Sequence, residues 1–453
     1  MKNISEENSI KQKGQIFPQK ESKKSNIVNS DKNKQIVITE SSEIKNTFKN
    51  KNKIQNLFST RIQIILTIIY FLIIIGSETL YRDYLFKKSI TIQENIQKNE
   101  KNKTILKFCR IISMFGGEIS TLFIFAIIFL ILPLNYSFLI LLAIVYPSYF
   151  TNTFKMIYQA DRPNWHSDLL TFSCNYGYGN PSGHSFTSVS LYLTLSHILV
   201  TYLKINNIIF RILIFTCFIS LSLFIIVSRV ILAAHSINQV IYGTTLGLGL
   251  YYILIYLIGY HKYSKVDFLR HIRSKKINYI YYITNISLLV LTILVYFIIN
   301  SKDTTLFEQN IFNGVRCKIK NKYLKYKNDG LFQSLSITCL IGAQLGINML
   351  FKILKKQNYL ISVAIIEWNK YKNIKIFFLR LLIVGISSLG ILLYYIIPKN
   401  SPLLLIYIFK SGLAFFLGMF GIHFLGIYLC IYLKISNSDI YKIDVLHEIT
   451  GTD

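Results

Sequence analysis

Three short polar stretches, between residues 155 and 239, hold the side chains that could do chemistry. In the first stretch, Lys155 and Arg162 are seven residues apart, and Pro163 follows directly. Seven residues make about two helical turns, so both cations would project from one helical face toward a common anion. The alternative is that these side chains only anchor a helix end at a membrane surface.

The second stretch, residues 180–184, reads Asn-Pro-Ser-Gly-His. Gly183 lets the backbone approach a ligand closely. Ser182 and the backbone N–H groups at the start of the next helix can donate to an anion, and a helix N-terminus favours negative charge there. We therefore expect His184 at that N-terminus, facing the loop. The alternative is a turn and a helix cap with an incidental histidine.

In the third stretch, Arg229 and His235 flank a tight connection between two apolar runs. His235 and Gln239 are four residues apart and so share one helical face. We expect the Gln239 amide oxygen to accept a hydrogen bond from His235 Nδ1–H. That bond would fix the tautomer and leave Nε2 free to attack. The alternative is a polar loop followed by a capped helix.

Long apolar runs must position these stretches. The chain has 453 residues, 52% of them hydrophobic, and a mean hydropathy of +0.41. Several runs approach about 20 residues with few charges, which is enough to cross a bilayer as a helix. Because the runs are continuous rather than alternating, they exclude a closed β-barrel. The sequence predicts an all-α fold, namely a polytopic, integral helical membrane protein.

About ten spans are expected, six in a core and four after it. Under this count the three stretches fall on one membrane face and form one site, because such polar groups at membrane ends are costly without a function. Gly342 and Gly346, in the eighth span, permit close helix packing. The expected spans are about 62–75, 119–132, 138–154, 184–202, 208–227, 235–259, 278–300, 331–351, 376–397 and 403–433.

The chain is expected to divide into five segments. Residues 1–58 are a basic, disordered cytoplasmic tail with 12 lysines and 6 acidic residues, too polar to form a core. Residues 59–260 are the six-helix core, and 261–277 are a basic cytoplasmic loop. Residues 278–434 are accessory transmembrane helices, and 435–453 are a C-terminal tail.

Charge placement indicates the partners and the orientation. Lys and Arg number 50 against 22 Asp and Glu, for a net charge of +28. The basic residues lie in the tail and loops, which favours anionic membrane lipids over nucleic acid. With a cytoplasmic tail, the loop 158–183 faces the lumen or exterior. The basic loops 81–108 and 301–330 share that face and disagree with this orientation. The membrane would be the endoplasmic reticulum, another endomembrane or the plasma membrane, and the oligomeric state stays open.

Together the three stretches suit phosphoryl transfer. Transfer of a phosphoryl group needs cations that neutralise its oxygens, a nucleophile, and an acid for the leaving group. His235 would be the nucleophile, giving a phosphohistidine. His184 would protonate the leaving oxygen and then activate water. No carboxylate cluster is evident that would hold a metal, so we expect no cofactor. The remaining groups would hold the phosphate: Lys155, Arg162, Ser182, Gly183 and Arg229.

The three stretches resemble the signature motifs of the type 2 phosphatidic acid phosphatase (PAP2) superfamily. These motifs are Lys-x6-Arg-Pro from Lys155, Pro-Ser-Gly-His ending at His184, and Ser-Arg-x5-His ending at His235. The superfamily includes lipid phosphate phosphatases, glucose-6-phosphatases and vanadium haloperoxidases. The resemblance covers about residues 61–259 and implies a six-helix core, with His235 as nucleophile and His184 as acid and base.

One residue departs from the usual pattern of the superfamily, which has Asp four residues after the nucleophile where this chain has Gln239. Gln at this place, and the Arg-Pro-Asn-Trp sequence from Arg162, resemble the glucose-6-phosphatase branch. Three spans leading to Lys155 instead resemble the lipid phosphate phosphatases. The favoured substrate is a lipid phosphate, either phosphatidate or a sphingoid-base phosphate. The alternatives are a sugar-phosphate phosphatase and a non-catalytic lipid-binding or transport protein with a degenerate site.

Overall fold

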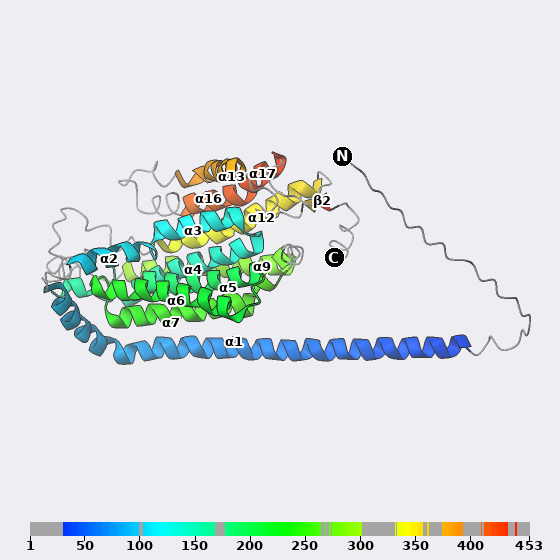
Figure 1. Cartoon of the computed structure of the whole chain (residues 1–453), viewed down its shortest axis with the longest axis horizontal. Coiled ribbons are helices and arrows are strands. Elements are labelled where there is room, and N and C mark those ends of the chain that lie inside the picture. The colour runs from blue at the N-terminus through cyan, green and yellow to red at the C-terminus, as the bar shows by residue number, and fades with distance from the viewer. Residues whose placement is uncertain are drawn as a thin grey trace, which may run out of the picture. The chain divides into compact units, whose positions relative to one another are not determined.

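The computed structural model divides the chain into two compact units, Met1–Ile62 and Gln63–Asp453 (Figure 1). The expectations for residues 1–29, for the loop 301–330 and for most of the C-terminal tail lie outside the residues that the structure describes. Apart from isolated positions, the described residues are 30–98, 103–167, 177–263, 274–300, 333–356, 374–392 and 412–433.

Helix α1 (Ser30–Lys98) is longer at both ends than the sequence predicts. It begins inside the segment that is expected to be disordered, because Lys, Glu and Gln are good helix formers even where they build no apolar face. It also continues through residues 81–98, where a loop is predicted. No Pro or Gly interrupts that stretch, so nothing ends the helix there.

The core consists of helices that run up and down between two ends. α5 packs against α4, α6 and α7, and α2 packs against α6. Short side chains allow this close approach, and Ser190 Oγ donates to Ala143 O at 3.2 Å. The core elements are α2 (Lys103–Met114), α3 (Glu118–Ile131), α4 (Leu134–Tyr158), η2 (Pro163–Trp165), α5 (Gly183–Tyr202), α6 (Ile208–Ile231), α7 (Ile237–Tyr252), the π-helical η3 (Ile253–Ile258) and η4 (Tyr260–Lys262).

Helix α4 also joins the core to the C-terminal helices. Tyr149 Oη donates to Leu288 O at 2.7 Å, and the hydroxyls of Thr153 and Thr292 are 3.2 Å apart. The C-terminal elements are α9 (Lys275–Asn300), η5 (Leu335–Ile337), α12 (Thr338–Lys356), α13 (Ile374–Ser387), η7 (Leu389–Leu392), α16 (Ala414–Gly421), η9 (Ile422–Gly426) and α17 (Ile427–Tyr432). Two short strands, β1 (Leu360–Ile361) and β2 (Ile440–Tyr441), pair antiparallel.

Close packing at Gly342 and Gly346 is confirmed, because both glycines of α12 lie against the backbone of α16. A Cβ at Gly342 would lie 2.3 Å from Phe416 O, and one at Gly346 would lie 2.9 Å from Phe420 O. Only residues without a side chain fit at these two positions.

Six helices of the described part of the chain are long and apolar enough to cross a membrane. Helix α5 has a similar length but carries Ser, Thr and His residues and lies inside the bundle. Three shorter apolar helices cover residues 120–131, 378–387 and 414–430. The prediction of an all-α, polytopic membrane protein is confirmed. The six spans are Thr60–Lys98, Leu134–Trp165, Ile208–Ile231, Ile237–Lys262, Lys275–Ile299 and Leu335–Ile353.

Candidate active site

The three predicted stretches meet at one end of the core. α2, α4 and α6 end there, and α3, α5 and α7 begin there. The contacts that join the stretches are specific: Arg162 Nη1 lies 3.3 Å from His235 Nε2, and Ser182 N–H donates to Gln239 O at 3.0 Å. Because three helices start at this end, their positive dipole ends favour an anion there.

His235 is held in one tautomer by a backbone carbonyl. Its Nδ1 lies 2.8 Å from Gly179 O and 3.3 Å from Gln239 Oε1, and both atoms are acceptors. The bond to Gln239 matches the sequence prediction, but the shorter bond goes to Gly179, which the sequence did not point to. With the proton on Nδ1, Nε2 carries the lone pair and faces Arg162 Nη1 at 3.3 Å.

The backbone that carries His235 is a tight turn at the end of α6. Ala234 N–H donates to Arg229 O at 3.0 Å, and Ala233 N–H donates to Val230 O at 2.9 Å. Ala233 has a φ of 53°, in the left-handed region that commonly ends a helix. The turn reverses the chain within a few residues and leaves His235 only 2% exposed.

The charge state of His235 suits a nucleophile. Burial is the first cause that holds its pKa well below the ordinary value, and the positive charges of Arg162, Arg229 and Lys155 add to the shift. The imidazole is therefore neutral at neutral pH. His184 is also close enough for its charge to act on His235.

Arg162 ties the loop after α4 to the His235 turn. Its Nη1 donates to Ala234 O at 2.6 Å, and its Nη2 donates to Tyr178 O at 3.1 Å. Its Nε donates to Gly177 O. The side chain is 5% exposed, so the guanidinium is fixed within reach of anything bound at His235 Nε2.

Arg229 has a donor available for an anion. Its Nη1 donates to Ser113 Oγ at 2.5 Å. Its Nε is buried and has no hydrogen-bond partner among the described residues. A buried donor without a partner costs free energy, so a bound phosphate oxygen would stabilise this guanidinium.

Lys155 and His184 are the remaining cation and imidazole of the candidate site. Lys155 lies in the last turn of α4, and His184 lies in the first turn of α5. The turn between α2 and α3 packs on His184: a Cβ at Gly116 would lie 3.3 Å from the His184 ring carbon Cδ2. The charges of Lys155, Arg162 and Arg229 all act on His184.

Ser182 caps α5 and also contacts the third stretch. Its backbone N–H donates to Gln239 O, and its hydroxyl is the N-cap of α5, with Ser185 Oγ donating to it at 3.0 Å. Ser182 N–H is therefore already engaged and does not remain for a phosphate. Gly183 lies at the start of α5, and a Cβ there would meet Thr151 Cγ2 at 3.1 Å. The phosphate donors that remain here are the Ser182 hydroxyl proton and Gly183 N–H.

Gln239 uses both ends of its amide. Its Oε1 accepts from Ser236 N–H at 3.2 Å, and its Nε2 donates to Asp161 O at 2.6 Å. A Cβ at Gly179 would lie 2.3 Å from Gln239 Nε2, so only glycine fits beside the amide. An ionised carboxylate has no proton to give to Asp161 O. The amide is thus part of how the loop is held.

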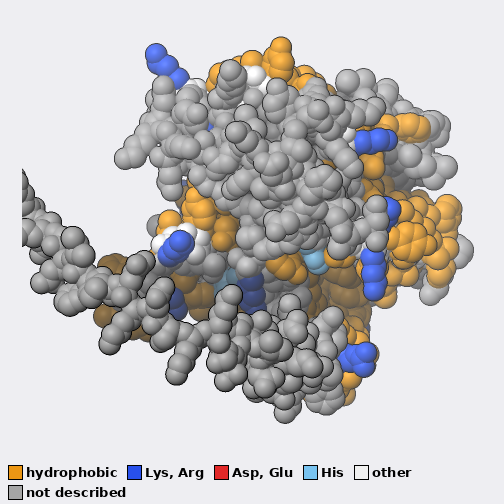
Figure 2. All heavy atoms as spheres, turned by 90° about the vertical axis from the view of Figure 1, so that its right-hand side faces the viewer, with side chains coloured by type: hydrophobic (Ala, Val, Ile, Leu, Met, Phe, Trp, Pro, Cys, Tyr) orange, Lys and Arg blue, Asp and Glu red, His pale blue; other side chains and the backbone are white. Residues whose placement is uncertain are grey.

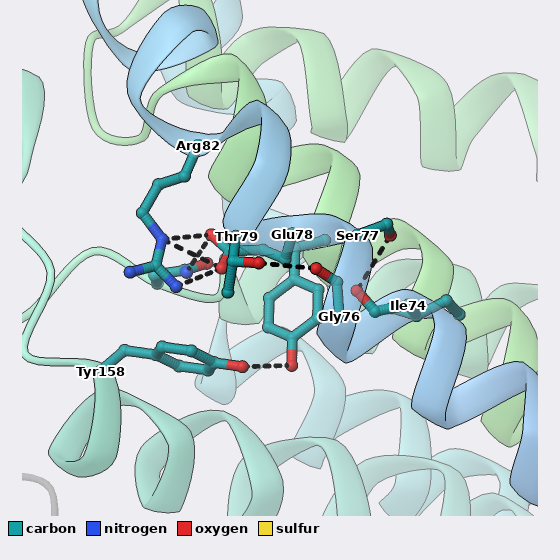
Figure 3. A network of polar contacts seen from close by, with 9 residues as sticks. Ile74, Gly76, Ser77, Glu78, Thr79, Arg82 and Tyr158 are labelled. Carbon is teal, nitrogen blue, oxygen red and sulfur yellow. Dashed lines mark hydrogen bonds and ion pairs between the residues drawn. The ribbon is translucent and has the colours of Figure 1, made fainter.

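Glu78 of α1 is a further residue at the site, and the sequence reasoning missed it. It is fully buried and accepts from Asn180 Nδ2 at 2.8 Å and from Arg82 Nε at 2.9 Å. Figure 3 shows Arg82 reaching Glu78, while Tyr158 lies beside them, 5.1 Å from the Arg82 guanidinium. The available signal was an acidic residue three positions after Ile75, where the apolar run ends.

The last turns of α1 also hold the His235 turn. Gln93 Nε2 donates to His235 O at 2.9 Å, and Ile237 N–H donates to Ser89 Oγ at 2.8 Å. Both α1 side chains are fully buried. The segment expected to be a loop is therefore a helix that braces the site.

Comparison with known proteins bears on the central part of the chain. The model of the PAP2 superfamily matches residues 134–263. This range runs from α4 to the residue after η4 and includes all eight predicted site residues, but not α1–α3. No curated protein matches the chain, and no solved structure matches it. Residues 134–263 of this helical membrane protein therefore match the PAP2 superfamily that the three motifs resemble.

Proposed function

We propose that the protein is a membrane-embedded phosphatase that hydrolyses a phosphomonoester through a phosphohistidine on His235. The observation that carries the proposal is the setting of His235 Nε2. Nε2 carries the lone pair because Nδ1 donates to Gly179 O, and the Arg162 guanidinium, whose Nη1 lies 3.3 Å from Nε2, would donate to an oxygen of a phosphate bound there. The PAP2 domain is consistent with this chemistry.

The reaction proceeds in two displacements. His184 takes up a proton when the anionic phosphate binds and offsets the neighbouring cations. His235 Nε2 then forms a bond to phosphorus, while the bond from phosphorus to the leaving oxygen breaks and His184 gives that oxygen its proton. Water then attacks phosphorus, His184 takes a proton from it, and the bond to Nε2 breaks to release inorganic phosphate. Lys155, Arg162 and Arg229 neutralise the equatorial oxygens throughout.

The favoured substrate is a lipid phosphate, presented at the lumenal or outer membrane face. Two candidate spans, in α1 and α4, and the shorter apolar helix α3 occur up to Lys155. Counted together, they give the three-span layout that resembles lipid phosphate phosphatases. The site also lies at the ends of membrane-spanning helices, where a lipid headgroup would be found. Phosphatidate and sphingoid-base phosphates have such headgroups.

Gln239 supports a second substrate class, the sugar phosphates. The amide donates to Asp161 O and accepts from Ser236 N–H, so the site is built around Gln rather than around Asp. Gln at this place is the feature that resembles the glucose-6-phosphatase branch. A soluble sugar phosphate would need no access from the bilayer.

A substrate panel separates these functions. Detergent-purified protein would be given phosphatidate, sphingosine-1-phosphate and glucose-6-phosphate, and released phosphate would be measured. We expect release from the lipid phosphates and acid-labile label on His235 when the substrate carries labelled phosphate. His235→Ala should abolish both, whereas His197→Ala, at the other end of α5, should leave both in place.

Each other outcome has a defined meaning. Release from glucose-6-phosphate alone would favour the sugar-phosphate function. Phosphate binding with no hydrolysis of any substrate would favour a non-catalytic lipid-binding or transport protein. Equal release by the wild type and by His235→Ala would contradict the phosphohistidine mechanism.

A further inference from the structure

Helix α2 presents three different faces. One face is buried, one is apolar and exposed, and one is basic and exposed. The 12-residue helix is too short to cross a bilayer, so this pattern does not belong to a span. The buried face consists of Leu106, Cys109 and Ser113, the apolar face of Ile105, Phe108 and Ile111, and the basic face of Lys103, Lys107 and Arg110.

The buried face fixes α2 to the active site. Leu106 and Cys109 pack in one cluster with Leu232 and Ala234 of the His235 turn. Ser113 accepts the hydrogen bond from Arg229 Nη1 at 2.5 Å. The position of α2 is therefore coupled to a cation that is expected to bind the phosphate.

The apolar face of α2 continues a lipid-facing surface. Phe108 is 56% exposed and Ile111 is 58% exposed, which is unfavourable in water. α2 packs against α6, a candidate span whose Phe224 is 59% exposed. Since the exposed side of α6 faces the bilayer, the neighbouring face of α2 lies at the edge of the same apolar surface.

The basic face adds charge of one sign. Lys107 and Arg110 are exposed, and α2 contains no Asp or Glu. A short helix with an apolar face and a row of Lys and Arg lies in the plane of the membrane interface, with its cations on anionic headgroups.

We propose that α2 is an interfacial helix that docks on anionic phospholipid headgroups beside the active site and raises the local concentration of phosphate-bearing lipids there. Its apolar face lies at the boundary between headgroups and acyl chains. The substrate-gathering part of this proposal rests on the proposed lipid phosphate function. The docking part does not.

The route from α2 to the reacting atoms is short. α2 ends at Met114, and the turn through Gly116 and Gly117 leads into α3. A Cβ at Gly117 would lie 3.8 Å from His184 Nε2. A headgroup phosphate held near Arg110 is thus at the end of the helix that leads to the proposed acid.

The depth of α2 tests the docking without any need for activity. Phe108→Trp and Lys107→Trp would each be placed in nanodiscs of zwitterionic and anionic lipid with brominated acyl chains. After subtraction of the parent signal, we expect strong quenching of the tryptophan at position 108 and at least threefold weaker quenching at position 107. Equal quenching of the two, or none at either position, would overturn the proposal.

A charge change tests the gathering of substrate. Lys107→Gln combined with Arg110→Gln should lower the rate on dilute phosphatidate in nanodiscs about thirtyfold relative to the rate on a soluble aryl phosphate, since each of the two basic residues near a headgroup surface contributes about 1 kcal/mol and about 1.4 kcal/mol is a factor of ten. The control, Lys275→Gln with Lys276→Gln, removes the same charge from the start of α9 and should leave this ratio unchanged.

An unchanged ratio in the α2 variant, or an equal fall in the control, would overturn the gathering of substrate. If the wild type hydrolyses no lipid phosphate at all, the proposed substrate is wrong. The quenching experiment then still decides whether α2 docks on the membrane.

Discussion

At the scale of single residues, the site is decided by which atom holds each side chain. His235 is oriented mainly by Gly179 O, 56 residues away in sequence, and Gln239 contributes a longer bond. Gln239 also joins the His235 turn to the loop after α4 through Asp161 O. The residue that departs from the usual superfamily pattern is therefore a positioning residue of this loop.

Replacement of Gln239 should lower activity. Gln239→Asp and Gln239→Glu both remove the donor to Asp161 O, and loss of one buried hydrogen bond costs about 1–3 kcal/mol. We expect kcat/KM for the best substrate of the panel to fall about tenfold or more in both variants. Gln239→Glu keeps the length of the side chain and so isolates the donor. A rise in turnover for Gln239→Asp would show instead that a missing carboxylate limits the enzyme.

The pH dependence follows from the lowered pKa of His235. Burial and then the neighbouring cations keep the imidazole neutral as the pH falls through about 6.5, the ordinary value for His. Because the neutral form is the nucleophile, protonation of His235 should not lower kcat/KM near pH 6.5. The same lowered pKa reduces stability below that pH, where the unfolded chain takes up a proton that the folded chain does not.

The measurement is kcat/KM between about pH 4.5 and 8. The second ionisation of the substrate phosphate, near about 6, would be measured by NMR and divided out. A remaining acidic limb near pH 6.5 that persists in a single-turnover assay of the phosphohistidine step would contradict the assignment. Thermal melts over the same range would check the stability effect.

At the scale of elements, α1 does more than cross the membrane. Its end contributes Glu78 to Asn180, Ser89 to Ile237 N–H and Gln93 to His235 O. These bonds join α1 to two of the three motif stretches. α1 lies outside the region that matches the PAP2 superfamily. These hydrogen bonds therefore support the site from outside the matched region.

Removal of the Glu78 carboxylate should loosen the loop that starts α5. Glu78→Ala leaves Asn180 Nδ2 and the Arg82 guanidinium without their acceptor. Because Arg82 is 30% exposed and can partly turn to water, we expect a loss of about 1–3 kcal/mol rather than the larger value for a fully buried pair. Asp83→Ala is the control, because Asp83 directly follows Arg82 in α1 and is exposed. The melting temperature of the purified protein and its kcat/KM should both fall for Glu78→Ala and stay unchanged for Asp83→Ala.

At the scale of the whole molecule, charge differs between the two ends of the core. The described acidic residues beyond position 60 all belong to elements at the site end: Glu78, Asp83, Glu94, Glu118 and Asp161. Both ends carry basic residues, such as Lys98 and Lys107 at the site end and Lys204 and Lys262 at the other, so the acidic residues are what distinguishes the two ends. In Figure 2 the described side chains in view are hydrophobic or basic, and no Asp or Glu is seen among them. We propose that the site end faces the lumen or the exterior.

Sidedness can be measured with a membrane-impermeant maleimide on intact cells or sealed microsomes. Lys98→Cys, at the end of α1, should be labelled only from the lumenal or outer side. Lys204→Cys, after α5, should be labelled only from the cytoplasmic side. The parent protein supplies the background from its own cysteines. The reverse pattern would place the site in the cytoplasm and contradict the proposed orientation.

The sequence by itself determined the class of fold and predicted which residues gather at the candidate site. Apolar runs of sufficient length form spanning helices wherever they occur, so the spans could be read locally. Lys155, Arg162, His184, Arg229 and His235 lie at ends of those runs. Once the runs alternate in direction, these ends must lie on one face.

The tertiary structure alone decided how the site is held. The Gly179 carbonyl reaches His235, Ser182 N–H is taken by Gln239, and Glu78 holds Asn180. Each of these bonds joins segments far apart in sequence, and no hydrophobic period or composition of the sequence indicates it. The path of a loop between two helices depends on packing around it. Its hydrogen-bond partners therefore cannot be derived from the motif residues.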